Sequence, residues 1–245
     1  MLYSRQALSK GGRLEENQMA VKLFILGLPG SGKSTVARYI MMYTRDKGWE
    51  PIHFNDYGIL QDMFLADSEH KQFKSADHGG FDIIDLNAFD IALKRLKQRV
   101  DEHISSAKSE EIILIEFSRN DYQRAFHQFS DEFLQDAYFL YLDAELDTCK
   151  PRIRDRVTKP TYNDDHYVSD YIFDAYYQGD NGRCLSNILK KDYKINQQRV
   201  LVIDNNCSLE GVSKEIDSFI DSNFVFESAQ LSTSVKPEEL YAGIQ

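Results

Sequence analysis

Apolar runs of strand length alternate along most of this 245-residue chain with segments whose apolar residues recur at helical spacing. The runs that favour strands lie at residues 21–26, 50–56, 111–116, 137–142 and 199–204. The segments that favour helices lie at residues 36–48, 57–65, 89–104, 120–129, 145–157 and 209–220. Because strands that alternate with helices form parallel sheets, we predict an α/β fold with a five-stranded parallel sheet covered by helices on both faces.

One segment, residues 158–196, breaks this rhythm. It is polar, rich in Tyr, Asn and Asp, and it precedes the last predicted strand. We therefore predict a core in two pieces, interrupted by a lid insertion and flanked by a flexible leader and a loosely attached tail. In chain order these parts are residues 1–19 (leader), 20–149 (core), 150–196 (lid insertion), 197–226 (core) and 227–245 (tail).

The composition is that of an ordinary globular protein, with 42% hydrophobic and 28% charged residues. The sequence contains no apolar run of membrane-spanning length, and its first twenty residues lack the apolar core of a secretion signal. The cysteines, at 149, 184 and 207, match no metal or redox spacing, so we expect buried thiols in a reducing cytoplasm. The formal net charge of -10 opposes attraction to a polyanion and disfavours a nucleic-acid partner.

A glycine-rich loop lies between the first predicted strand and the first predicted helix. It reads Gly27-Leu28-Pro29-Gly30-Ser31-Gly32-Lys33-Ser34-Thr35 and fits the phosphate-binding pattern GxxxxGK[ST] at every fixed position. Its glycines allow successive N–H groups to converge on a phosphate, and the helix N-terminus adds partial positive charge. We expect Lys33 to reach the terminal phosphates and the Ser34 hydroxyl to ligate Mg²⁺. The alternative, a glycine-rich turn that binds nothing, is disfavoured by the flanking strand and helix.

Two acids end predicted strands beside this loop. Glu116 closes a continuous apolar strand, which is the position of an acid that helps to hold magnesium in P-loop enzymes. Asp56 ends the preceding strand, where a carboxylate can accept a proton from an attacking hydroxyl group. The alternatives are a solvated carboxylate for Glu116 and, for Asp56, a cap on the helix that starts at Tyr57.

A basic helix follows the fourth predicted strand. Arg152 and Arg156 are four residues apart, so they share a helix face and can point at one anion. Arg154 points elsewhere and is expected to pair with an acid. Arginine suits charge that builds on a phosphoryl group in the transition state. A solvated basic helix face is the alternative.

Together these features resemble the small P-loop kinases. The loop at 27–35, the acids that end strands two and three, and the stretch from Leu140 to Arg156 carry the resemblance, which extends over residues 20–222. This group includes adenylate, gluconate, shikimate and adenylylsulfate kinases, the kinase domain of polynucleotide 5′-hydroxyl kinases, and zeta-toxin-like enzymes. The resemblance implies a P-loop NTPase fold, ATP as co-substrate with Mg²⁺, and Asp56 as the base. It also implies a mobile lid that begins at the arginine-bearing helix, and Asn205 and Asn206 beside the adenine.

Two departures from this pattern limit which residue roles the resemblance assigns to this chain. The insertion is longer than a minimal lid and contains no arginine between Arg156 and Arg183. The stretch from Glu116 to Arg119 is similar to the Glu-Arg-Ser stretch of deoxynucleoside kinases but has an inserted residue, so we do not transfer that role. The insertion's tyrosines lie among many acids, which favours a self-packed aromatic cluster over a surface that stacks bases.

The sequence therefore predicts an ATP-dependent phosphotransferase that moves the γ-phosphoryl group to a hydroxyl of a small-molecule or nucleoside-like acceptor. A polynucleotide 5′-hydroxyl kinase is the alternative within this class. The alternative from another class is a nucleotide-binding regulatory ATPase without a diffusible acceptor. The sequence specifies neither the acceptor nor the oligomeric state.

Overall fold

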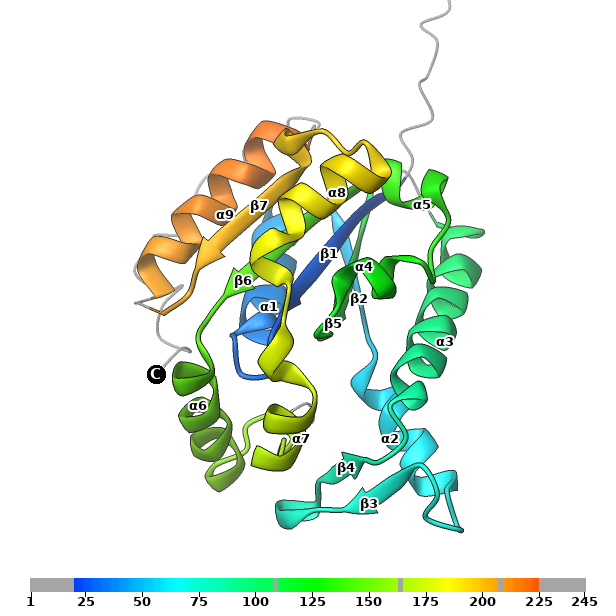
Figure 1. Ribbon diagram of the computed structural model, residues 1–245. Helices are drawn as coiled ribbons and strands as arrows, with labels where there is room; N and C mark the ends of the chain where they lie inside the picture. The colour runs from blue at the N-terminus through cyan, green and yellow to red at the C-terminus, as the bar shows by residue number, and fades with distance from the viewer. Residues whose placement is uncertain (1–19, 108–109, 163–164, 207–208, 225–245) are drawn as a thin grey trace, which may run out of the picture.

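The computed structural model describes residues 20–107, 110–162, 165–206 and 209–224. Its centre is a five-stranded sheet in the order β2-β5-β1-β6-β7, and all of its neighbouring strands run parallel (Figure 1). The strands are β1 (Val21–Gly27), β2 (Glu50–Asn55), β5 (Glu111–Phe117), β6 (Ala137–Asp143) and β7 (Val200–Asp204). The predicted sheet is confirmed, with each strand end within one residue of its expected position.

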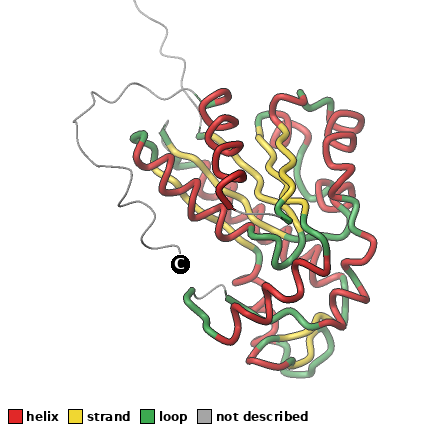
Figure 2. Tube along the Cα trace, turned by 90° about the vertical axis from the view of Figure 1, so that its left-hand side faces the viewer, coloured by secondary structure: helices red, strands yellow, loops and turns green. Residues whose placement is uncertain are grey.

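Helices cover both faces of this sheet (Figure 2). Because side chains alternate along a strand, Leu23 and Ile25 of β1 pack on one side and Phe24 and Leu26 on the other. The Leu23 side is covered by α1 (Lys33–Asp46) and α9 (Leu209–Asn223). The Phe24 side is covered by α3 (Asn87–Ile104), α4 (Tyr122–Phe126), α5 (Asp131–Gln135) and α8 (Leu185–Tyr193).

A small hairpin that the sequence did not predict follows α2 (Tyr57–Ala66). Its strands, β3 (Phe73–Ser75) and β4 (Phe81–Ile83), pair antiparallel around the turn η1 (Asp77–Gly79). Buried Phe73 and Ile83 anchor the hairpin in the core. The Asp67 carboxylate accepts hydrogen bonds from the main-chain N–H groups of Gln72 and Phe73 at 2.7 and 2.9 Å. The hairpin lies beside the carboxyl ends of the sheet strands, since Phe81 and Ile83 of β4 line the same cleft as Asp56 and Glu116.

The predicted insertion contains several short helices. Helix α6 (Leu146–Thr158) begins before residue 150 and continues into it, α7 (Asp170–Ala175), η2 (Tyr177–Gly179), η3 (Gly182–Cys184) and α8 lie within it, and η4 (Gln197–Arg199) follows it. Leu185 and Leu189 of α8 are fully buried in the main core, as are Cys149 and Ile153 of α6. The ends of the 150–196 segment are therefore part of the core, as are the buried Ile172 and Phe173 of α7, and a lid over residues 150–196 stays a prediction.

The remaining predictions concern one helix, the two ends of the chain and membrane-spanning segments. The helix predicted at 120–129 is the shorter α4, which begins where the Asp121 side chain accepts a hydrogen bond from the Arg124 N–H. The short helix α5, which begins where the Ser130 side chain accepts from the Phe133 N–H, was not predicted. The predicted leader and tail lie outside the described residues. No helix in the described ranges is long and apolar enough to cross a membrane.

Candidate active site

The glycine-rich loop connects β1 to α1 at the carboxyl end of the central strand. Gly27, Gly30 and Gly32 have φ angles of 144°, 80° and 98°, a region that glycine adopts readily. A Cβ atom at Gly30 would lie 2.6 Å from the Cys149 carbonyl oxygen, and one at Gly32 would lie 2.6 Å from the Asn205 Nδ2. The loop is therefore packed closely between α6 and the segment after β7, and side chains at these positions would force them apart.

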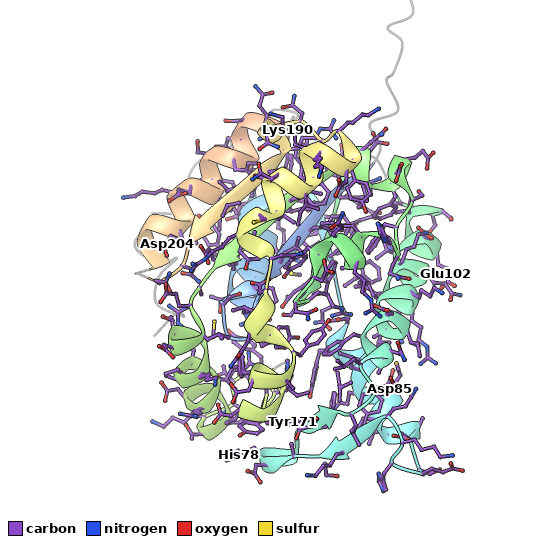
Figure 3. All side chains as sticks on the ribbon, viewed as in Figure 1. His78, Asp85, Glu102, Tyr171, Lys190 and Asp204 are labelled. Carbon is purple, nitrogen blue, oxygen red and sulfur yellow. The ribbon has the colours of Figure 1, made fainter. Side chains whose placement is uncertain are left out.

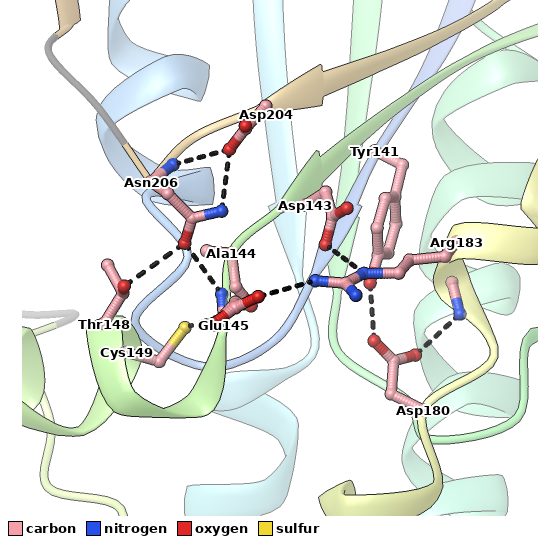
Figure 4. A network of polar contacts seen from close by, with 11 residues as sticks. Tyr141, Asp143, Ala144, Glu145, Thr148, Cys149, Asp180, Arg183, Asp204 and Asn206 are labelled. Carbon is pink, nitrogen blue, oxygen red and sulfur yellow. Dashed lines mark hydrogen bonds and ion pairs between the residues drawn. The ribbon is translucent and has the colours of Figure 1, made fainter.

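Buried hydrogen bonds fix the conformation of this loop. Asn205 Nδ2 donates to the Ser31 carbonyl oxygen at 2.6 Å, and the Gly27 N–H donates to the Tyr122 hydroxyl at 2.9 Å. Asn206 lies further out, where its Oδ1 accepts from the main chain at the start of α6 (Figure 4). Asn205 thus supports the loop from behind, and contact of Asn205 and Asn206 with adenine stays a prediction.

Lys33, Ser34 and Glu116 meet at the start of α1. Lys33 Nζ donates to the Leu28 carbonyl oxygen at 2.8 Å, and Ser34 Oγ donates to Glu116 Oε1 at 2.8 Å. The other Glu116 oxygen lies 2.9 Å from His53 Nε2. Burial acts to raise the pKa of Glu116, but His53, Lys33 and Ser34 outweigh it and hold that pKa below its usual value. A hydroxyl oxygen and an ionised carboxylate are suitable ligands for Mg²⁺, so Ser34 and Glu116 fit a magnesium ion.

Asp56 and Arg119 form a buried ion pair in the same cleft. Arg119 Nη1 donates to Asp56 Oδ2 at 2.6 Å and to the Ser118 carbonyl oxygen, while Nη2 donates to the Phe89 carbonyl oxygen at 2.8 Å. The Asp56 side chain makes no capping hydrogen bond with the described residues of α2, so the capping alternative is wrong. Burial raises the pKa of Asp56 although Arg119 acts to lower it. A base whose pKa lies closer to neutrality accepts a proton more effectively at neutral pH.

Arg119 is the site residue that sequence reasoning left without a role. It stands three positions after Glu116, just beyond a strand that is buried on both faces, and its own side chain is buried. A buried arginine needs a nearby acid, but its burial is visible only in the structure; the sequence shows no more than an arginine close after an apolar strand.

Arg152 and Arg156 both line the cleft from α6, as their spacing predicted. The Arg156 guanidinium donates to the His166 carbonyl oxygen at 3.1 Å from Nε and 2.7 Å from Nη2. Arg152 Nη1 is buried and finds no hydrogen-bond partner in the described part of the chain. Arg154 points away from the cleft and pairs with Asp170 at 2.8 Å. A buried guanidinium nitrogen without an acceptor fits an anionic ligand, since a phosphate oxygen would satisfy it.

The cleft that these residues share has a volume of about 330 Å³, which is within the range of small-molecule sites. One side is formed by the glycine-rich loop and the α6 arginines, and the other by largely apolar side chains of α2, β4 and α3. The predicted site residues that line it are Pro29, Gly30, Gly32, Lys33, Ser34, Thr35, Asp56, Glu116, Arg152 and Arg156.

A polar network fixes residues 180–183 of the insertion to β6 (Figure 4). The Tyr141 hydroxyl donates to Asp180 Oδ2 at 2.5 Å, and Arg183 Nε donates to Asp143 Oδ1 at 2.9 Å. Gly182 lies directly on the Tyr141 ring, where an added Cβ atom would come within 2.1 Å of ring atoms. Residues 180–183 are therefore anchored to the sheet, which places the C-terminal limit of any moving segment before them.

A family model described as Novel STAND NTPase 3 matches residues 12–158. No curated protein sequence matches the chain. A sugar kinase from a Janibacter species is similar in structure at 17% identity and a TM-score of 0.52, over 82% of this chain and 95% of that one. The APS kinase of Mycobacterium tuberculosis, solved with AMPPNP and APS, is similar at 15% identity and a TM-score of 0.50, over 83% and 98%. Both likenesses confirm the predicted P-loop kinase fold.

Proposed function

The chain belongs to the Novel STAND NTPase 3 family, and from that premise we propose that it binds ATP with Mg²⁺ and transfers the γ-phosphoryl group to a hydroxyl group of an acceptor. The observation that carries this proposal is the position of Asp56, a buried carboxylate in the same cleft as Lys33 and Glu116. The same cleft also has an apolar wall, which hydrolysis by water does not need and which offers contacts to an acceptor larger than water.

The residues of the cleft have complementary roles in this reaction. The loop N–H groups bind the phosphates, and Lys33 exchanges the Leu28 carbonyl for phosphate oxygens. Ser34 and Glu116 hold the Mg²⁺, which, when bound, compensates charge on the transferring group. Arg152 and Arg156 add positive charge from α6 as negative charge develops.

Asp56 serves as the base in this proposal. The acceptor oxygen forms a bond to the γ-phosphorus, the bond from phosphorus to the β–γ bridging oxygen breaks, and the hydroxyl proton passes to Asp56. Because Arg119 neutralises Asp56 in the free protein, it also limits the repulsion between Asp56 and the incoming phosphates.

A second candidate is an ATPase that acts as a regulatory switch without a diffusible acceptor, which the match to an NTPase family favours. A polynucleotide 5′-hydroxyl kinase has less support, because the net charge is -10. Location in the cytoplasm stays a prediction.

The test compares ADP release by wild-type protein and Lys33→Ala, with and without a panel of hydroxyl-bearing acceptors. Loss of the Lys33 contact is expected to cost on the order of 3 kcal/mol of transition-state stabilisation. Lys47→Ala is the control, since Lys47 pairs with Asp221 on the surface. Unchanged turnover in folded Lys33→Ala contradicts the nucleotide site, and turnover that no acceptor accelerates favours the ATPase.

A further inference from the structure

The cleft has an apolar wall that the proposed ATP site does not use. It is formed by Tyr57, Leu60, Phe81, Ile83, Phe89 and Tyr177. Tyr57 directly follows Asp56 and begins α2. Because Asp56 and these side chains line the same cleft, a molecule whose hydroxyl group is held at Asp56 can place its remaining atoms against this wall.

Tyr57 stacks with flat rings. The imidazole of His166 lies on it with ring centroids 3.7 Å apart and planes inclined by 11°. Phe81 lies nearly parallel to Tyr57 at 6.0 Å, and Phe64 nearly parallel to Phe81 at 5.0 Å. His166 belongs to a segment, residues 165–169, that contains neither helix nor strand. The position on Tyr57 thus accepts a flat heteroaromatic ring, and the chain itself supplies one from a segment without regular structure.

The Arg119 guanidinium next to this wall is largely engaged by protein acceptors, although its buried Nε has no partner among the described residues, and this limits the chemistry of the ligand. Arg119 donates to Asp56, to the Ser118 carbonyl oxygen and to the Phe89 carbonyl oxygen. A sugar or another polyol would lose water from several hydroxyl groups here and recover few hydrogen bonds. The faces of an aromatic ring lose no hydrogen bonds on burial, and ring stacking adds to the gain.

Resting on the function proposed above, we propose that the acceptor is an alcohol that carries a heteroaromatic ring, such as a nucleoside. Its ring takes the place of the His166 imidazole on Tyr57, and its hydroxyl group lies at Asp56. That hydroxyl oxygen forms the bond to the γ-phosphorus of ATP, ADP leaves with the bridging oxygen, and Asp56 takes the hydroxyl proton.

Acceptor binding is measured by calorimetry on the full chain without ATP, so the result does not depend on phosphoryl transfer. The probes are adenosine, guanosine, cytidine and thymidine, with ribose, gluconate and shikimate as polyols. We expect at least one nucleoside to bind more tightly than every polyol. Tighter binding of a polyol, or no binding of any nucleoside, overturns the proposal.

Variants show where the nucleoside binds. Tyr57→Leu is expected to weaken binding about tenfold, the size of one lost stacking contact, and Tyr57→Phe to retain wild-type affinity. His166→Ala is expected to bind at least as tightly as wild type, because it removes the competing ring. Tyr171→Leu is the control, since Tyr171 is 56% exposed on α7 and does not line the cleft (Figure 3).

Two results overturn the placement on Tyr57. One is wild-type affinity in Tyr57→Leu, as expected if the nucleoside occupied the adenine position of ATP. The other is a loss in His166→Ala as large as that in Tyr57→Leu. The proposed function is tested separately by comparing ATP binding to wild type and to Lys33→Ala, because Lys33 lies in the loop half of the cleft and Tyr57 in the other half. Equal ATP affinity of the two proteins contradicts the nucleotide site, whereas the nucleoside measurements test only the acceptor.

Discussion

The Arg119 guanidinium lies 2.6 Å from the Asp56 carboxylate, and both side chains are buried in the cleft. The two residues stand 63 positions apart in the sequence and follow neighbouring strands, β2 and β5. Neither charge has bulk water to stabilise it, so each depends on the other. The pair therefore connects the stability of the protein to the residue that we propose as the catalytic base.

Removal of Arg119 should destabilise the folded protein. Arg119→Ala leaves the Asp56 carboxylate buried without its partner, which is expected to lower the free energy of unfolding by about 3–5 kcal/mol. Arg124→Ala is the matched control, because the Arg124–Asp90 pair is exposed and is expected to contribute at most about 1 kcal/mol. Urea denaturation measures the stability of both variants. Equal midpoints would show that the buried pair contributes no more to stability than the exposed pair.

Replacement of Asp56 should remove the acid limb of the pH–rate profile. Asp56 must be ionised to accept a proton, and burial raises its pKa, so the rate should fall as pH falls through a value above that of an ordinary aspartate. Asp56→Asn is expected to lower phosphoryl transfer by about a hundredfold and to leave ATP affinity nearly intact. The measurement is kcat/KM against pH, with circular dichroism to verify folding. An unchanged acid limb in Asp56→Asn would assign it to another group.

The dependence on magnesium should respond to His53. His53 contacts the Glu116 oxygen that does not accept from Ser34, so it orients the carboxylate expected to hold the ion. Ser34→Ala and His53→Ala are each expected to raise the Mg²⁺ concentration for half-maximal activity by about ten- to a hundredfold. His103→Ala is a close control, because His103 lies 2.7 Å from Glu111 at the opposite end of β5. Overlapping metal titrations of the two histidine variants would exclude this role for His53.

The segment between α6 and η2 should respond to nucleotide. Residues 165–169, which contain neither helix nor strand, contact α6 through the Arg156–His166 hydrogen bonds, whereas Phe173 of α7 and Leu189 of α8 are buried in the core. A non-hydrolysable ATP analogue is therefore expected to increase protection from hydrogen exchange in residues 165–169 more than in α8.

The cleft arginines should act mainly on the rate. Arg152→Ala and Arg156→Ala are expected to lower kcat more than they raise KM for ATP, while Arg154→Ala, which loses only its exposed pair with Asp170, should behave as wild type. Steady-state kinetics measure this split. Wild-type kcat in both cleft variants, together with unchanged exchange in residues 165–169, would remove that segment and the two α6 arginines from the mechanism.

The sheet and the glycine-rich loop were predictable because their signals are local. An apolar run marks a buried strand, and the glycine positions of the loop follow from its backbone angles. The Asp56–Arg119 pair was not predictable in the same way, since it depends on the register that places β2 beside β5. Helix α8 was not predicted because the segment around it is polar, although its apolar residues Leu185, Leu189 and Tyr193 recur at every fourth position. The β3–β4 hairpin has strands of three residues, which is too short for alternation to be visible.

The strand order also has a consequence for synthesis on the ribosome. β1 is made before both of its partners in the sheet, which begin to pair with it at Ile112 in β5 and Ala137 in β6. At typical translation rates the 91 residues from Val21 to Ile112 take roughly 5 to 18 s to emerge. During that interval the apolar β1 segment, which carries the glycine-rich loop, has neither neighbour in the sheet. We therefore expect the nascent chain to be a client of chaperones until β5 and β6 have left the ribosome.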